Sequence, residues 1–174
     1  MKNMNKIDIY MITHKSVDYI PNGITPLFVG DGTNEDSYIR DNIGDNISNK
    51  NKNYCELTAL YWMWKNSNAD ILGLCHYRRF FGKNEKDILD SYCEWLFSIL
   101  FELENRIDIN NRNDYQKRVY GFISERLLTV WILKNKLNVH EYPLYLTEIN
   151  RYYNIKKIIK KEIIKFVLLV GGQK

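Results

Sequence analysis

The sequence predicts a single α/β domain whose carboxy-terminal half is helical. Short apolar runs of strand length are separated by segments with helical periodicity, and long amphipathic patterns then follow one another. At 174 residues and 45% hydrophobic content, the chain is long enough for one ordinary core and too short for two comfortable domains. We therefore assign residues 1–148 to one domain and residues 149–174 to a basic amphipathic helix.

Three apolar runs predict the strands of a sheet, and two of them end in polar clusters. Ile7–Ile12 is followed by Thr13, His14 and Lys15. A second run covers Pro26–Gly30. The third, Ile71–Cys75, is followed by the polar set His76, Tyr77, Arg78 and Arg79. Ligands of α/β sheets bind beyond the carboxyl ends of the strands, so we expect both clusters at a ligand-binding edge.

Helical spacing of apolar residues predicts the remaining elements. A loop rich in Gly, Asp, Asn and Ser joins Gly30 to Asn53, and Asn53 is then expected to cap the first helix. Pro143 limits another apolar run to an edge strand, because proline cannot donate to a central ladder. The expected helices are Tyr54–Asn66, Asp87–Arg106 with Asp87 as its cap, Tyr115–Asn135 and Ile149–Val170. The expected edge strand is Val139–Leu146.

Charge and cysteine usage narrow the functional classes. The formal charge of +4 is modest for a nucleic-acid-binding protein, but basic residues concentrate at 76–79 and at 151–165, where they can meet phosphates or an anionic membrane. The three cysteines lack zinc-site spacing, so we expect Cys55, Cys75 and Cys93 to be reduced core residues. The polar start of the chain predicts no signal or anchor and hence a cytoplasmic protein.

The polar clusters contain the residue types that bind a diphosphate. Arginine pairs with phosphate oxygens through its planar fork, and a histidine donates a further hydrogen bond. The alternative is a solvated strand end with structural ion pairs. The start of the first helix also favours an anion, although capping alone explains Asn53. The candidate binding residues are Thr13, His14, Lys15, Lys50, Asn53, Tyr54, Glu56, His76, Tyr77, Arg78 and Arg79.

One carboxylate is a candidate general base. Glu125 lies mid-helix and can take an acceptor proton if the helix faces a cleft; a structural glutamate is the alternative. No Asp-x-Asp pair, His-Glu-x-x-His, Walker or Gly-x-Gly-x-x-Gly pattern occurs, so cationic side chains are expected where other enzymes use a metal. We expect no permanently bound cofactor, and the sequence leaves a role for a divalent metal open.

Several segments occur in an order that resembles a family of bacterial glycosyltransferases. They are Ile9–Lys15, Tyr54–Asn66, Gly73–Phe81, Tyr92–Phe97 and Gly121–Leu128. The family acts in capsule, exopolysaccharide and lipopolysaccharide synthesis. Some members are assigned as galactofuranosyltransferases, and many carry only a domain-of-unknown-function label.

The resemblance implies a GT-A-like, Rossmann-like sandwich that binds a UDP-sugar and passes a hexosyl unit to a glycan or lipid-linked acceptor. It places His14, Lys15 and the set from His76 to Arg79 near the donor. Residues 82–91 replace a long stretch of the family between two of the motifs, so an inactive, shortened relative that retains nucleotide binding is an alternative. A basic nucleic-acid-binding module is another. The lysine-rich tail predicts peripheral contact with the inner face of the membrane, with packing on the core as its alternative.

Overall fold

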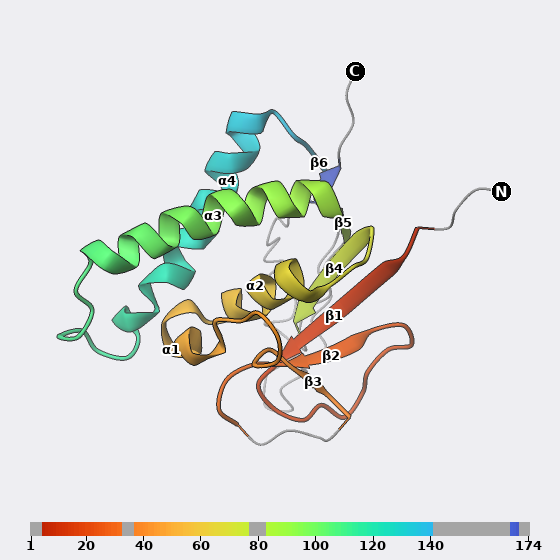
Figure 1. Cartoon of the computed structure of the whole chain (residues 1–174), viewed down its shortest axis with the longest axis horizontal. Helices are drawn as coiled ribbons and strands as arrows, with labels where there is room; N and C mark the ends of the chain where they lie inside the picture. Colours follow the sequence, from red (N-terminus) through yellow and green to blue (C-terminus); the bar gives the residue numbers. More distant parts are fainter. Residues whose placement is uncertain (1–4, 33–36, 77–82, 141–167, 171–174) are drawn as a thin grey trace, which may run out of the picture.

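The computed structural model describes residues 5–32, 37–76, 83–140 and 168–170. A five-stranded sheet forms its base, in the order β3-β2-β1-β4-β5 (Figure 1). The first four strands are parallel and β5 is antiparallel to β4. This confirms the predicted α/β class. The strands are β1 Ile7–Thr13, β2 Thr25–Phe28, β3 Ile39–Arg40, β4 Ile71–His76 and β5 Lys83–Glu85.

Helices cover one face of the sheet and make up most of residues 86–140 (Figure 1). The long helices confirm the predicted helical carboxy-terminal half. The helical elements are η1 Ser48–Lys50, α1 Asn51–Tyr54, α2 Leu57–Asn66, α3 Lys86–Arg106, η2 Gln116–Arg118 and α4 Val119–Asn135.

Aromatic contacts join the helical layers to the sheet. Tyr10 of β1 meets Trp62 of α2 edge to face, with ring centroids 5.7 Å apart. On the outer side of α2, Trp64 stacks on Phe97 of α3 at 5.8 Å. Trp131 of α4 packs in turn against α3. Aromatic pairs of this kind stabilise the fold beyond the contribution of burying their surface. The core therefore extends from the sheet through α2 into α3 and α4.

The strand order reverses at β1. From β1 the chain adds β2 and β3 on one side, then passes through α1 and α2 and returns as β4 on the other side. Ile12 of β1 is in register with His76 of β4, so the carboxyl ends of these two strands lie next to each other. A reversal of this kind is the usual ligand-binding position in open α/β sheets.

The structure moves the start of three predicted helices, and the one expected from Tyr115 begins at Val119 as α4. The helix expected from Tyr54 begins instead at Leu57, because α1 ends before it at Tyr54. Asn53 therefore lies inside α1 and is not a cap. Asp87 is not a cap either, since Glu85 holds the N-cap position of α3. Tertiary pairing also produces β3, which falls in a segment predicted as a loop, and β5, where no element was predicted.

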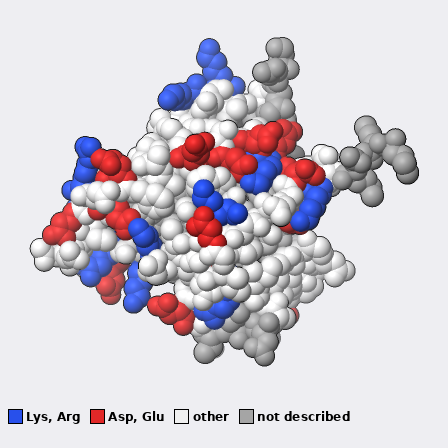
Figure 2. All heavy atoms as spheres, viewed as in Figure 1, with Lys and Arg blue, Asp and Glu red and all other residues white. Residues whose placement is uncertain are grey.

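The end of the chain also departs from the prediction. Leu168–Val170 was expected to finish the basic helix, but it forms strand β7, which pairs antiparallel with β6, Asn138–His140. The rest of that expected helix, and residues 141–146 of the expected edge strand, lie outside the described residues. Within the described part of the chain, no helix has the length and apolarity needed to cross a membrane. Acidic and basic side chains are interspersed on the face shown in Figure 2.

Candidate functional site at the carboxyl edge of the sheet

A tight turn ends β1 and exposes His14 and Lys15. The Thr13 hydroxyl donates to the Lys15 carbonyl at 2.5 Å and accepts from the Lys15 amide at 3.2 Å. Thr13 itself is fully buried, so its role is to shape this turn rather than to contact a ligand. The next two side chains are exposed at the strand end, where the sequence placed them.

The loop after β2 lies against the same turn. A β-carbon on Gly32 would come within 3.2 Å of the His14 carbonyl oxygen, so only glycine permits this approach without a shift. Arg40, at the end of β3, donates to the Gly30 carbonyl at 2.9 Å and lies over the Phe28 ring at 4.9 Å. Sequence reasoning missed Arg40, because it is a single basic residue in a segment predicted as loop.

His76 and Glu56 form the most specific contact of the site. His76 Nε2 lies 3.3 Å from Glu56 Oε1. The histidine side chain is 11% exposed and the glutamate side chain is 60% exposed. The sequence predicted both as ligand-binding residues, and the structure brings them together. Tyr77, Arg78 and Arg79, which follow His76 in the chain, lie outside the described residues.

A strained residue separates α1 from α2 and precedes Glu56. Cys55 has φ 54° and ψ −131°, close to the first central position of a type II′ turn, where glycine is usual. A non-glycine residue in such a conformation costs about 1–3 kcal/mol. Asn51 offsets part of that cost, since its Nδ2 donates to the Cys55 carbonyl at 2.9 Å and to Thr58 Oγ1 at 3.1 Å.

A buried carboxylate, that of Asp41, binds the start of η1. Asp41 is 1% exposed, and its Oδ1 accepts from Ser48 Oγ at 2.5 Å. Its Oδ2 makes no hydrogen bond with the described residues. Burial raises the pKa of Asp41, while the Ser48 and Thr58 hydroxyls and the charge of Arg40 partly oppose the increase. Asp41 was not among the predicted residues, because only its burial distinguishes it from other loop aspartates.

The amino-terminal end of α4 packs against Cys55, the residue between α1 and α2. Arg118 Nε donates to Cys55 Sγ at 3.0 Å. This hydrogen bond is the largest cause of the raised pKa of Arg118, and the nearby Glu56 raises it further. A hollow of about 80 Å³ lies here, and Glu125 lines it together with Cys55, Glu56 and Arg118. The predicted base Glu125 is exposed and lines this hollow together with Glu56.

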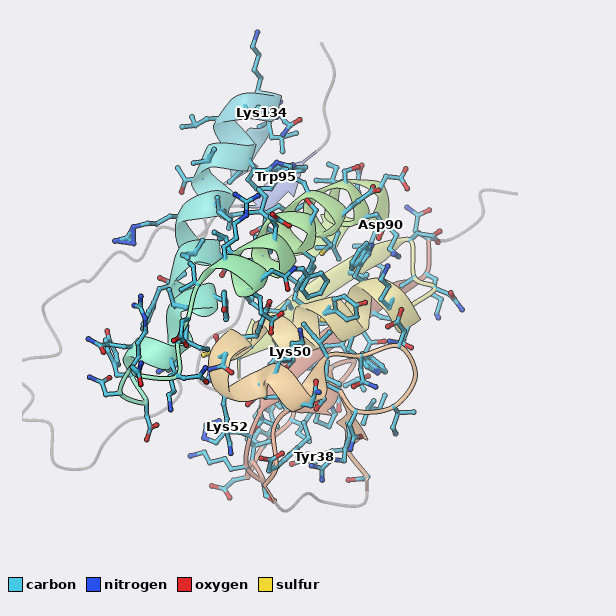
Figure 3. All side chains as sticks on the ribbon, turned by 60° about the vertical axis from the view of Figure 1, so that its left-hand side comes forward. Tyr38, Lys50, Lys52, Asp90, Trp95 and Lys134 are labelled. Atoms are coloured by element: carbon cyan, nitrogen blue, oxygen red, sulfur yellow. The ribbon has the colours of Figure 1, made fainter. Side chains whose placement is uncertain are left out.

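Three predicted binding residues have structural partners instead. Lys50 Nζ lies 2.5 Å from Glu104 Oε2 of α3 (Figure 3). Tyr54 is fully buried, its hydroxyl donates to the same carboxylate at 3.2 Å, and burial raises its pKa. Asn53 Nδ2 donates to the Lys117 carbonyl at 3.1 Å. These contacts hold the helices together.

The described residues contain no group of three or more His, Cys, Asp or Glu side chains placed to hold a metal ion. The cysteines also stand apart from one another: Cys75 and Cys93 are buried, as predicted, but Cys55 is partly exposed. Among the described residues, the charged and polar side chains at this edge are His14, Lys15, Arg40 and the His76–Glu56 pair.

Together these features define a Rossmann-like α/β domain with a polar edge at its switch point, the position where open α/β sheets usually bind ligands. The chain belongs to the family described as Domain of unknown function (DUF4422), whose model matches residues 8–87 and 84–136. It is also similar to a solved structure described as the apo structure of the WbbM bifunctional glycosyltransferase. The TM-score is 0.72 and the identity 26%; the match covers 84% of this chain and 46% of that chain. No curated protein matches the sequence significantly.

Proposed function

We propose that this chain is a nucleotide-sugar-dependent glycosyltransferase domain that binds its donor at the carboxyl ends of β1 and β4. The observation that carries the proposal is the adjacency of these two strand ends at the switch point, which sets the segment of His14 and Lys15 beside His76. The similarity to a bifunctional glycosyltransferase over 84% of the chain supports the reaction class. Because the chain spans under half of that protein, its own reaction needs a direct test.

The chemistry of the edge suits a diphosphate. Lys15 supplies a point charge, His14 and His76 supply N–H donors, and the two arginines that follow His76 in sequence supply planar forks. These groups would neutralise the charge that grows on a departing nucleoside diphosphate when the glycosidic bond breaks. Glu125 remains the candidate base for the acceptor hydroxyl, since it is exposed on α4.

The finer assignment follows the family resemblance. We propose a hexosyl donor, with galactofuranosyl as one candidate, and UDP as its nucleotide. The acceptor is a surface-polysaccharide or lipid-linked glycan, met at the cytoplasmic face of the membrane. The lysine-rich segment 151–165 would bring the domain to that surface. No resident cofactor is needed for this chemistry, and the donor complex decides whether a divalent metal takes part.

A second candidate is a shortened relative that binds nucleotide without transferring sugar. The family matches meet at residues 84–87, where β5 leads directly into α3. This close junction supports the hypothesis that the chain lacks the stretch which the family carries between these two segments. The nucleic-acid-binding alternative gains no similar support, because opposite charges are mixed on the face of the molecule shown in Figure 2.

Titration calorimetry with UDP and with uridine tests the proposal. We expect UDP to bind more tightly than uridine, and Arg78→Ala, Arg79→Ala or Lys15→Ala to weaken UDP binding about tenfold while uridine binding changes little. Lys134→Ala, near the end of α4 (Figure 3), is the matched control. No binding of UDP or UDP-sugars at millimolar concentration would overturn the donor-site proposal. Binding without transfer from any UDP-sugar would favour the shortened relative.

A further inference from the structure

We propose that Glu56 is a positioning residue, which holds the His76 imidazole at the ligand-binding edge and acts on the ligand only through that ring. The inference rests on the proposed function, because it assigns His76 to the donor side of the same site. It adds a role that the sequence did not distinguish, since His76 and Glu56 were predicted side by side as direct binding residues.

The geometry of the pair gives the two residues different roles. His76 is in register with Ile12, a core residue, so its ring lies on the helix-covered face of the sheet, and its side chain is only 11% exposed. Glu56 reaches it from the helical layer with a side chain that is 60% exposed. The 3.3 Å separation of Nε2 and Oε1 is slightly longer than a usual hydrogen bond and lies within ion-pair distance.

The backbone break is what directs Glu56 toward the strand end. An uninterrupted helix through residues 51–66 would continue the path of α1 past Cys55, but the positive φ there turns the chain before α2 begins. Glu56 occupies the N-cap position of α2 and yet makes no side-chain capping hydrogen bond. Its carboxylate is therefore engaged by His76 rather than by the helix it precedes.

Glu56 lies between the guanidinium of Arg118 and the imidazole of His76. Arg118 binds Cys55 Sγ at 3.0 Å, and its pKa is raised by that bond and further by Glu56. The guanidinium thus lies on the α4 side of Glu56, while the imidazole lies on the β4 side. A carboxylate placed in this way fixes the orientation of a histidine ring, as carboxylates do for histidines that bind metals or accept protons. An oriented ring loses less freedom when the ligand binds.

A double-mutant cycle on UDP affinity tests whether Glu56 acts through His76. We expect Glu56→Ala and His76→Ala each to weaken UDP binding about five- to tenfold, and the double variant to bind no more weakly than His76→Ala alone. Glu56→Gln, which keeps an oxygen acceptor, should stay within about twofold of the wild type. Glu102→Gln on the exposed face of α3 is the matched control, with no expected effect.

The imidazole itself supplies a readout that needs no ligand. The chain has only three histidines, so the His76 signals in a ¹H–¹⁵N spectrum of the side chains are assigned by their loss in His76→Ala. We expect the proton on Nε2 to be protected from exchange in the wild type and in Glu56→Gln. In Glu56→Ala this protection should be lost, while the urea midpoint of unfolding changes little.

The outcomes separate this proposal from the proposed function. If the wild type binds no UDP, the donor-site assignment fails, and the spectra alone decide whether Glu56 holds His76. Additive losses in the cycle, or an unchanged His76 signal in Glu56→Ala, would overturn the positioning role even if UDP binds. A wild-type affinity in His76→Ala would overturn it as well.

Discussion

Lys50 Nζ lies 2.5 Å from Glu104 Oε2, across 54 residues of sequence, and this pair joins the start of α1 to α3. The lysine also lies over the Phe101 ring at 5.2 Å, and the Tyr54 hydroxyl donates to the same carboxylate. Each side chain of the pair is about one-third exposed, at 33% and 32%. The lysine that sequence reasoning assigned to an anionic ligand is therefore bound to a carboxylate of its own chain.

Replacing Lys50 should affect folding and leave ligand binding unchanged. Lys50→Ala is expected to lower the free energy of unfolding by about 1 kcal/mol, because a partly exposed ion pair is screened by water. Glu104→Gln should cost a similar amount, and the double variant should cost less than the sum of the two. Urea unfolding measures these values, with calorimetric UDP titration in parallel. A tenfold loss of UDP affinity in Lys50→Ala would restore its predicted role as a binding residue.

Asp41 should make the protein less stable as the pH rises. Burial raises the pKa of this carboxyl, so the folded protein holds the proton more tightly than the unfolded chain does. Between the unfolded value of about 3.9 and the raised folded value, the free energy of unfolding falls with increasing pH. Asp41→Asn removes the titrating carboxyl and with it this pH dependence. We expect the urea midpoint of this variant to rise relative to that of the wild type from pH 4 upward and then to level off.

A second substitution separates the charge of Asp41 from its hydrogen bond. Asp41→Ala leaves Ser48 Oγ without its acceptor and should be about 1–3 kcal/mol less stable than Asp41→Asn at every pH in this range. The account would be contradicted if Asp41→Asn lost stability relative to the wild type as the pH rose. That result would mean that the positive charge of Arg40 outweighs the burial of the carboxylate.

Cys55 should be the thiol that reacts first. It is partly exposed, whereas Cys75 and Cys93 are buried, and burial raises the pKa of the Cys75 thiol to about 12 and raises that of Cys93 as well. Reaction depends on access and on the thiolate form. A colorimetric disulfide reagent should therefore titrate one thiol per folded chain quickly, and the other two only in guanidinium.

The matched variant for this test is Cys55→Ser, which should lose the fast phase and keep the two thiols that react in guanidinium. Persistence of the fast phase in that variant would show that another cysteine is accessible. Arg118→Ala should change the rate of the fast phase, because Arg118 donates to the sulfur in the folded chain. An unchanged rate would mean that this contact does not control access to the thiol.

Local patterns in the sequence were enough for the elements with strong periodicity. The predicted strands Ile7–Ile12 and Ile71–Cys75 match β1 and β4 to within one residue, and the predicted helix from Asp87 matches α3. Strand ends followed by polar clusters also indicated the ligand-binding edge, because a buried strand must stop where charged side chains begin. The fold class follows from these signals alone.

Tertiary contacts decided what local patterns could not. A break at Cys55 is invisible in a sequence whose helical spacing continues from Tyr54 to Asn66, because the residue is neither glycine nor proline. The two-residue strand β3 exists only through its pairing with β2. Arg40 and Arg118 gain their positions from backbone and sulfur partners that only the folded chain supplies.

The sequence by itself determined an α/β domain with cationic groups at two strand ends, since burial and periodicity are properties of neighbouring residues. The tertiary structure decided which polar residues hold the fold together and which lie at the ends of the strands. Lys50 and Tyr54 share a carboxylate on a helix that begins more than thirty residues later, while Glu56 meets His76 on a strand. A hydrogen bond depends on the three-dimensional position of both partners, and packing sets those positions.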